Sequence, residues 1–586
     1  MKKIISLILA LSLLAGCVTV LSGCGAPDND GAHIAVYLGS TVYDFDPTDY
    51  YVNDNAEQVM SLLFEPLFSV DGDGKLHNSG ADSYEINEEK RQIVIQLKES
   101  YWSDAIRVKA ADYVYAWCER ILNPNMPNPA ASLLYSIENA AAAKTGRCSI
   151  SDIGAKATGI YELTLTYTEG ADVDRLLRNL SSVATSPVRH DMVDTCPTYW
   201  TKNVNTMVFN GPFKIRTYDE LSGQLSLSRN VGYHQDPTVK DYDNKVRPGE
   251  LVGLTTPEGE ALELTYADIE SKVTFFMGDA TLADRTANKA KAKVVANNST
   301  YTYVFNTENP LFADYRVRLA LSLALDRQAI AAAVSFGKAA DGFIPNEFGG
   351  ASESFISGSA DIDRARELLA SADLGGASKS FALTIRNTEA DNAIADLAIE
   401  AWSALGFAVT KSYAAPVTTE LSGDITVTDS GIQVLAKEAS YGKLVSVTTD
   451  KKGNEKTEYL FDVLALDWQF YTDDPFVGLC AFSSSLGGWG VDFATGTSRK
   501  NLSGWSSQDY DYLINALLKD TSGEYNSYLA EAERILCENA PVIPVLFNES
   551  FAFVGKELSK VTTDGNGNFV FTAAKQKNFE DYLVQE

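Results

Sequence analysis

Patterns typical of strands and of helices alternate along the whole chain. Between residues 93 and 97 every second position is apolar, as in a half-buried strand. From Val114 to Leu122 the apolar residues recur at intervals of three and four, which places them on one face of a helix that ends at Asn123-Pro124. The same spacing predicts further helices over 317–325, 394–405 and 528–536. The alternation predicts a mixed α/β protein with more than one lobe.

Two glycine-rich segments predict tight hairpin turns. Residues 71–74 (D-G-D-G) and 564–567 (D-G-N-G) contain residue types that tolerate the positive φ such turns require. Residues 411–461 are rich in Thr, Ser and Gly, with scattered β-branched residues. This composition predicts an inserted hairpin region or a mobile loop.

Composition and charge narrow the classes of function. The 586 residues are 45% hydrophobic and 22% charged, which is ordinary for a globular protein. At roughly 100–200 residues per domain, this length predicts several domains. Seventy-eight acidic residues against 49 basic ones give a net charge of −29. Because such a field repels phosphate backbones, we do not expect a nucleic-acid partner.

The first 24 residues predict an export signal. A pair of lysines precedes the apolar run 4–14, and two Leu-small-Gly-Cys motifs follow, ending at Cys17 and Cys24. This motif resembles the bacterial lipobox, whose cysteine receives a diacylglycerol that anchors the protein to the membrane. We favour Cys24 over the alternative Cys17, because the polar tether 25–30 follows it. The other interpretations are an ordinary cleaved signal and an uncleaved membrane span.

The remaining cysteines and the histidines predict no metal site or catalytic centre. The cysteines form neither a C-x-x-C pair nor a Cys/His cluster with metal spacing, and we expect most of them to be small buried hydrophobic residues. The four histidines are not in H-E-x-x-H, and the chain has no G-x-S-x-G or Walker motif. We therefore expect a protein that is not an enzyme and that holds no metal or cofactor, with a secreted hydrolase as the alternative. The cysteines beyond the export signal are Cys118, Cys148, Cys196, Cys480 and Cys537.

One segment is similar to a motif of a known family. Residues 101–112 (Y-W-S-D-A-I-R-V-K-A-A-D) resemble the W-S-D-G-x-P-V-T-A-x-D stretch of the peptide-type extracellular solute-binding proteins of family 5, the oligopeptide and dipeptide receptors of ABC importers. Lys109 stands where the family has a Thr that would cap the next helix. Because Lys cannot accept a hydrogen bond there, we expect Asp112 in the first turn to take over part of that role.

Further fragments resemble the same family, in the same order along the chain. Each match is short, but together they extend over nearly all of residues 33–570 and identify the chain as a member. The fragments are 46–47, 63–67, 128–132, 210–214, 301–306, 316–327, 474–475 and 540–545.

The resemblance implies an α/β, two-lobed, periplasmic-binding-protein-like clamp (type II, cluster C) with an extra subdomain in the first lobe. Two crossing segments, near 300–305 and 542–547, would form the hinge between the lobes. The implied divisions are a signal peptide 1–23, a lipid-anchored tether 24–32, lobe I at 33–68, 201–297 and 544–586, the extra subdomain 69–200, and lobe II at 298–543.

The resemblance also implies a ligand site in the segment 467–475. In oligopeptide receptors this run contains a Trp and then an Asp that pairs with the α-ammonium of the ligand. Trp468 matches, whereas Tyr471 stands in place of the Asp and Asp467 in place of a Gly. Either Asp467 or Asp473 supplies the anion from a shifted position, or the ligand lacks a free α-ammonium. Ala465 likewise stands where an arginine for the ligand carboxylate is expected.

Other implied site residues lie outside this segment. The loop at 50–52 matches one that touches the ligand in the family, and two aromatic residues of the crossing segments could line the cleft. Packing in the core is the alternative for each aromatic residue. The expected ligand-binding set is Trp468, Asp467, Gln469, Tyr471, Asp473, Tyr50, Tyr51, Val52, Tyr303 and Phe547.

The function implied by the resemblance is solute capture. We expect a monomeric extracytoplasmic lipoprotein, anchored to the cell membrane, that encloses an oligopeptide between two lobes and delivers it to an ABC permease for import. The alternative within the same fold is a non-peptide solute such as a sugar, a metal chelate or haem.

Overall fold

The computed structural model describes residues 32–577, except for 43, 49–55, 196–199, 202–203, 205, 239–244, 257–272, 278–285, 349–352, 414–426, 429–430, 433–444, 450–454, 493–496 and 519–523. The export signal, both candidate lipid-bearing cysteines, Cys196 and the loop Tyr50–Val52 lie outside the described residues. Within the described part of the chain, no helix is both long enough and apolar enough to cross a bilayer.

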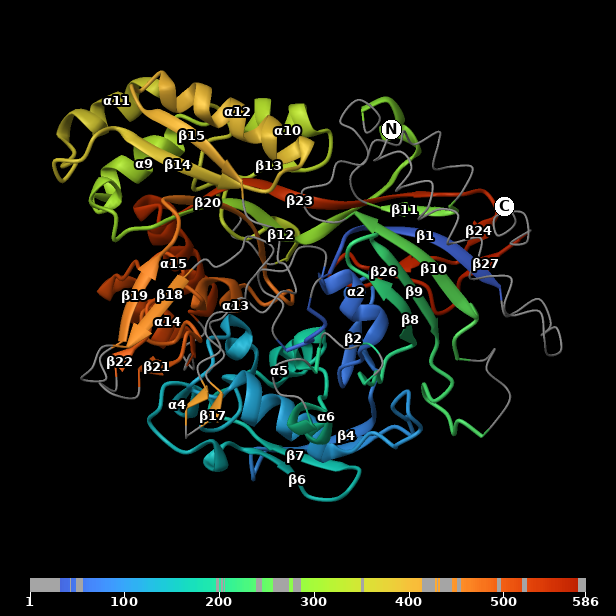
Figure 1. Ribbon diagram of the computed structural model, residues 1–586. Coiled ribbons are helices and arrows are strands. Elements are labelled where there is room, and N and C mark those ends of the chain that lie inside the picture. The colour runs from blue at the N-terminus through green and yellow to red at the C-terminus, as the bar shows by residue number, and fades with distance from the viewer. Residues whose placement is uncertain are drawn as a thin grey trace.

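One 11-stranded sheet runs through the molecule and joins its two halves (Figure 1). Ten of its strands follow one another, and β13 (Lys338–Ala339) pairs with β23 outside this path. The order is β15 (Ala408–Tyr413), β14 (Ser380–Ile385), β20 (Val463–Gln469), β12 (Lys293–Phe305), β23 (Val542–Val554), β11 (Phe275–Met277), β1 (His33–Ser40), β10 (Glu250–Thr256), β9 (Gln224–Arg229) and β8 (Phe213–Asp219).

The central pair of strands, β12 and β23, connects the halves. Each strand has 13 residues; at one end the pair borders β11, and at the other it borders β20. Their antiparallel ladder changes register between Ala296 and Thr300 and again between Tyr301 and Thr302. Such irregularities interrupt strand pairing locally and increase the twist. The crossing segments expected from the resemblance lie within these two strands.

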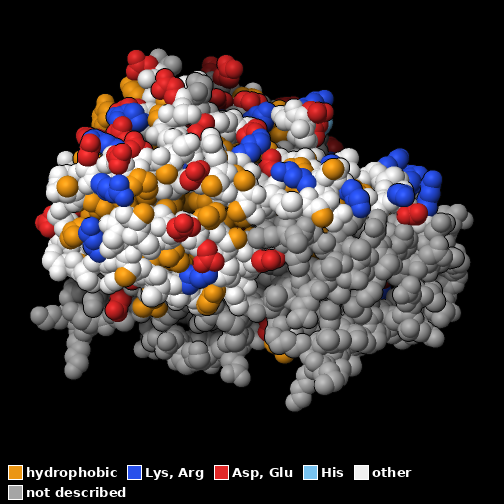
Figure 2. Space-filling model, turned by 90° about the horizontal axis from the view of Figure 1, so that it is seen from above, with side chains coloured by type: hydrophobic (Ala, Val, Ile, Leu, Met, Phe, Trp, Pro, Cys, Tyr) orange, Lys and Arg blue, Asp and Glu red, His pale blue; other side chains and the backbone are white. Residues whose placement is uncertain are grey.

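Four helices pack on the β14–β15 end of the sheet (Figure 1). The helices predicted over 317–325 and 394–405 are confirmed as α9 (Tyr315–Leu323) and α12 (Glu389–Ser403). The indole N–H of Trp402 donates to the Leu321 carbonyl at 2.9 Å and ties these two helices together. Acidic and basic side chains are interspersed on the outer face here (Figure 2). The other two helices are α10 (Arg327–Val334) and α11 (Ile362–Ser371).

A separate four-stranded sheet lies below the main one (Figure 1). Its strands are β4 (Ala81–Asn87), β5 (Gln92–Leu97), β7 (Glu162–Thr166) and β6 (Ala155–Ala157). The strand predicted at 93–97 is confirmed as β5, with Ile93 and Ile95 fully buried. The helix predicted before Pro124 is also confirmed, although only α3 (Ala110–Val114) is α-helical and Tyr115–Ile121 continues as a π-helix.

The expected replacement of the helix cap at α3 is confirmed. The Lys109 side chain makes no capping bond. A carboxylate oxygen of Asp112 accepts the Lys109 backbone N–H at 3.0 Å and the indole N–H of Trp102 at 3.1 Å. The carboxylate therefore closes the first turn from inside the helix.

The largest apolar core extends across the division that the resemblance implies between lobe II and the extra subdomain. It includes residues of α13 (Pro475–Cys480), α14 (Gln508–Leu518) and α15 (Tyr525–Asn539), together with the 3-10 helix Pro129–Leu134. A backbone hydrogen bond also joins the two parts, because the Asn128 N–H donates to the Gly488 carbonyl at 2.7 Å. The α13–α15 region thus packs on the lower part of the molecule.

Both predicted hairpin turns are confirmed. They connect β2 (Phe68–Val70) with β3 (Leu76–Asn78), and β25 (Thr562–Thr563) with β26 (Phe569–Val570). The antiparallel pair β18 (Val445–Thr449) and β19 (Glu455–Tyr459) confirms a hairpin within 411–461.

The remaining elements are α2 (Ala56–Leu63), α4 (Ala140–Lys144), α5 (Val173–Asn179), α6 (His190–Thr195), β16 (Val427–Thr428), β17 (Gly431–Ile432), β21 (Val491–Asp492), β22 (Thr497–Ser498), β24 (Leu558–Ser559) and β27 (Lys575–Gln576), with short 3-10 helices at Ile150–Asp152, Val183–Thr185, Lys289–Lys291, Pro310–Phe312 and Asn346–Phe348.

The described cysteines are all free thiols. Cys118, Cys480 and Cys537 are buried, which confirms the expectation for most of them, whereas Cys148 is partly exposed. Burial raises the pKa of Cys118 to about 12, so its thiol stays protonated at neutral pH.

We predict that Lys109→Thr stabilises the protein by about 1 kcal/mol, because a Thr hydroxyl can accept an N–H of the first turn of α3. Asp112→Ala should destabilise it by a similar amount. Urea unfolding of both variants checks this. Glu119→Ala, an exposed change beyond the cap, serves as the control and should stay within about 0.5 kcal/mol. An unchanged or lower midpoint for Lys109→Thr would contradict the capping argument.

Candidate functional site

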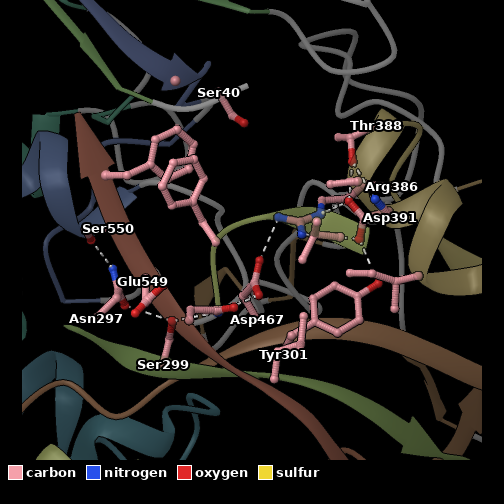
Figure 3. Close-up of a pocket in the computed structure, with 18 of the residues that line it drawn as sticks. Ser40, Asn297, Ser299, Tyr301, Arg386, Thr388, Asp391, Asp467, Glu549 and Ser550 are labelled. Carbon is pink, nitrogen blue, oxygen red and sulfur yellow. Dashed lines mark hydrogen bonds and ion pairs between the residues drawn. The ribbon is translucent and has the colours of Figure 1, made fainter. Parts of the chain in front are cut away.

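A cavity of about 220 Å³ lies where the two halves of the sheet meet (Figure 3). Ser40 and Met277, at the carboxyl ends of β1 and β11, line one side. Arg386, just after β14, and Asp467 of β20 line the other side, and residues of β12 and β23 lie between them. In open α/β sheets, ligands bind in the crevice beyond the carboxyl ends of strands. The position of this cavity makes it the candidate ligand site.

A charged network occupies the β14–β20 side of the cavity (Figure 3). The Arg386 guanidinium donates to Asp391 through Nε at 3.0 Å and through Nη2 at 3.2 Å. Its Nη1 pairs with Asp467 Oδ2 at 2.8 Å. Asp391 is buried, and the Arg386 and Asp467 side chains are largely buried. One guanidinium therefore bridges two carboxylates in a place that water reaches poorly.

Residues of the crossing strands connect to this network. The Tyr301 hydroxyl, from β12, donates to Asp391 Oδ1 at 2.8 Å. From β23, Asn548 Nδ2 donates to Asp467 Oδ1 at 2.7 Å and contacts Ser299 Oγ at 2.8 Å. A change in the angle between the halves would therefore alter the hydrogen bonds that Asp391 and Asp467 accept from the crossing strands.

The structure does not bring the expected residues of 467–473 together in one site. Asp467 and Gln469 line the 220 Å³ cavity, whereas Trp468 and Tyr471 border a hollow of about 10 Å³ beside Pro129, to which Gln469 also contributes. That hollow has room for about one water molecule. The separation follows from β20 itself, because successive side chains of a strand point to opposite faces.

Trp468 is packed rather than open to a large cavity. It is 6% exposed and stacks on Phe482 with ring centroids 4.7 Å apart, and Phe343 lies beside it. Any ligand that reaches Trp468 must first widen the hollow beside Pro129.

Asp473 lies on the other side of the chain reversal that follows β20. Tyr471 has φ +65°, in the left-handed region, and the chain turns there. Asp473 then pairs with Arg178 of α5 at 2.8 Å and lines a different cavity of about 340 Å³. The neighbouring Asp474 accepts a bond from Asn179 at 3.0 Å, and burial raises the pKa of Asp474. The Asp473–Asp474 pair thus joins this turn to α5.

The two aromatic residues of the crossing strands are buried. Tyr303 is fully buried in the core of the α9–α12 half, against Trp402, and desolvation raises the pKa of its hydroxyl. Phe547 is 5% exposed and its backbone pairs with Thr300 and Lys338. Neither borders the three cavities described above.

Sequence reasoning missed Arg386, Asp391 and Asn548 as site residues. Arg386 and Asp391 lie in a segment for which no motif was recognised, about 80 residues before Asp467. The signal available was a charged residue directly after the largely apolar run 381–385, which forms β14 and ends at the edge where ligands bind. In the described part of the chain, no group of three or more His, Cys, Asp or Glu could hold a metal ion.

The fold defines the class of protein. The structure described as "Listeria monocytogenes OppA bound to peptide" superposes with a TM-score of 0.73 over 93% of this chain and 99% of that chain, at 18% identity. The chain therefore has the two-lobed, type II periplasmic-binding-protein-like fold that the family resemblance implies, and that expectation is confirmed.

The family follows from the sequence match. Residues 75–489 match the family described as "Bacterial extracellular solute-binding proteins, family 5 Middle", and the chain belongs to this family.

Two curated relatives illustrate the range of the family. The "Probable deoxycholate-binding periplasmic protein YgiS" of Escherichia coli is 27% identical over 283 residues, which are 47% of this chain and 50% of that protein. The "Dipeptide-binding protein DppE" of Bacillus subtilis is 23% identical over 566 residues, or 92% of this chain and 93% of that protein. The match thus spans about half the length of the first relative and nearly all of the second.

We predict that Arg386→Ala destabilises the protein by about 3 kcal/mol, because it leaves the buried Asp391 carboxylate without its counter-charge. The double variant with Asp391→Asn should recover part of this loss. Chemical unfolding of the single and double variants measures the coupling.

Arg366→Ala is the matched control, since Arg366 forms an exposed pair with Asp363 on α11. It should change the free energy of unfolding by less than about 0.5 kcal/mol. Equal effects of the two arginine substitutions would show that the Arg386 network is not a buried charge pair.

Proposed function

We propose that this chain captures peptides between its two halves and delivers them to an ABC permease for import. The observation that supports this most directly is the edge of β20. Strand β12 pairs with β20 along Val463–Gln469, whereas β14 pairs with it only at Val463 and Leu464. Among the described strands, none continues that second edge beyond Leu464.

An extended peptide fits such an edge. Backbone groups of successive strand residues point alternately to the two edges. The Phe470 N–H points toward β12 and bonds the Asn298 carbonyl. Asp467 and Gln469 lie an odd number of residues before Phe470, so their backbone groups point to the opposite edge, beside the cavity. A peptide added there would gain main-chain hydrogen bonds that do not depend on its sequence.

Asp467 is the anion we propose for the α-ammonium of the peptide. Of the two carboxylates considered for this role, Asp467 lines the cavity, whereas Asp473 is paired with Arg178 outside it. We propose that Gln469 contacts the ligand beside Asp467. Trp468, Tyr471 and Phe547 would take part only after the halves open, and the loop Tyr50–Val52 remains a proposed contact that lies outside the described residues.

The N-terminal segment bears on where the protein acts. We propose that it is a monomeric lipoprotein, exported by residues 1–23 and anchored outside the cytoplasm through Cys24, because the lipobox-like motif and the polar tether agree. The divisions proposed for the lobes are those given by the family resemblance, with the hinge in β12 and β23. We propose binding without covalent chemistry, since the family is one of solute-binding proteins.

A relative named for deoxycholate binding makes a non-peptide solute the second candidate. Thermal unfolding with a dipeptide-to-pentapeptide pool, deoxycholate, oligosaccharides and metal chelates separates the two. We expect the peptide pool to stabilise the protein, by about 2.7 kcal/mol at one hundred times Kd. Stabilisation by deoxycholate or sugars alone would overturn the peptide assignment.

Hydrogen exchange locates the bound peptide. We predict slower exchange of the backbone amides of Asp467 and Gln469 when peptide is bound, because these two groups point to the edge away from β12 and would enter a strand ladder with the peptide. The amides of β5 are the internal control and should not change. Protection confined to segments outside β20 would refute the placement.

The anchor has its own test. We predict that Cys24→Ser abolishes attachment of diacylglycerol and releases the protein from the membrane fraction, because the cysteine sulfur is the atom that receives the diacylglycerol. Cys17→Ser should leave the anchor intact. Mass spectrometry that finds diacylglycerol on Cys17 would reverse the assignment.

A further inference from the structure

The charge of the cavity is unbalanced. Among the described residues that line the cavity, Arg386 is the only cation. Three carboxylates also line the cavity, those of Asp391, Asp467 and Glu549. The described lining residues therefore have a net charge of −2. The outer surface near α11 and α12 differs, because both signs are interspersed there (Figure 2).

Arg386 is already committed to carboxylates of the protein. Three of its nitrogens bond Asp391 and Asp467 at 2.8–3.2 Å. A ligand carboxylate that approached Arg386 would have to displace Asp467, and it would then leave that carboxylate without its ion pair. An ammonium or guanidinium group would instead add a cation beside the two carboxylates that bond Arg386.

Glu549 places a further negative charge on the β23 side of the cavity. Its Oε2 accepts the Gly337 backbone N–H at 3.0 Å. Lys338 lies nearby but bonds Glu347, and this pairing, with a weaker effect of Glu549, raises the pKa of Lys338. Among the described residues, Lys289 donates its Nζ to the Ser335 carbonyl and lies over the Phe336 ring.

We infer that the solute held in this cavity is cationic: a peptide with basic side chains, whose ammonium or guanidinium groups lie between Asp467 and Glu549 and whose carboxylate is not bound by Arg386. This inference rests on the proposed function and adds a ligand class to it. The polar neighbours Asn297, Ser299 and Asn548 supply oxygen atoms that can accept further N–H bonds from such groups.

Calorimetric titration with three tetrapeptides of equal length tests the charge preference: Lys-Ala-Lys-Ala, Ala-Ala-Ala-Ala and Glu-Ala-Glu-Ala. We expect the basic peptide to bind about tenfold tighter than the neutral one, and the acidic peptide to bind more weakly than both. The preference should shrink as NaCl is raised, because salt screens charges that remain near water.

Two variants trace the preference to the cavity. Asp467→Asn and Glu549→Gln should each reduce the ratio of basic to neutral affinity at least threefold, and the second tests the inference even if the first unfolds. Asp396→Asn is the matched control, because Asp396 also lies on the cavity-lining helix α12 but pairs with Lys411 away from the cavity. It should leave the ratio unchanged.

The possible outcomes separate a failure of the charge inference from a failure of the proposed function. If the acidic peptide binds as tightly as the basic one, or if neither cavity variant alters the ratio, the inference is wrong while peptide capture stands. If no peptide binds, the proposed function fails, and 1,5-diaminopentane against glutarate tests the charge inference separately. Tighter binding of glutarate, or of deoxycholate, would overturn it.

Discussion

Strand pairing between β12 and β23 is the constraint on which the rest of the structure depends. These two strands hold both halves of the sheet in one ladder, and their register changes beside the cavity. Since backbone hydrogen bonds fix each half internally, the hinge that we propose between the halves lies at these irregular positions. Tyr301 and Asn548 lie at this place and bond carboxylates of the cavity wall. The geometry of the strands and the electrostatics of the site are therefore coupled.

The Arg386 network shows how the proposed solute site can hold charged side chains at little cost to folding. A buried carboxylate alone would be strongly unfavourable, but Asp391 accepts bonds from Arg386, Tyr301 and Thr388. Asp467, at the more accessible end of the network, has one side toward the cavity. The buried part of the network thus fixes the position of Arg386, and the accessible part adds negative charge to the wall of the cavity.

The lower half of the molecule constrains how far the halves can separate. The turn after β20 is joined to α5 through Asp473 and Asp474, and the α13–α15 region shares an apolar core with the strands and helices below. Opening between these parts would expose apolar surface as well as break ion pairs. The small hollow at Trp468 is the consequence of this close packing.

The sequence by itself determined the local structure and the family. Apolar spacing placed α9, α12 and β5, turn chemistry placed both hairpins, and the exchange of Thr for Lys109 predicted the role of Asp112. Only the tertiary structure decided which side chains share the cavity. Alternation along β20 and the left-handed turn at Tyr471 separate Asp467 from Trp468 and Asp473, although they are neighbours in sequence. The sheet order brings Arg386 and Asp391 to Asp467 across some 80 residues, and a one-dimensional pattern contains no information on that distance.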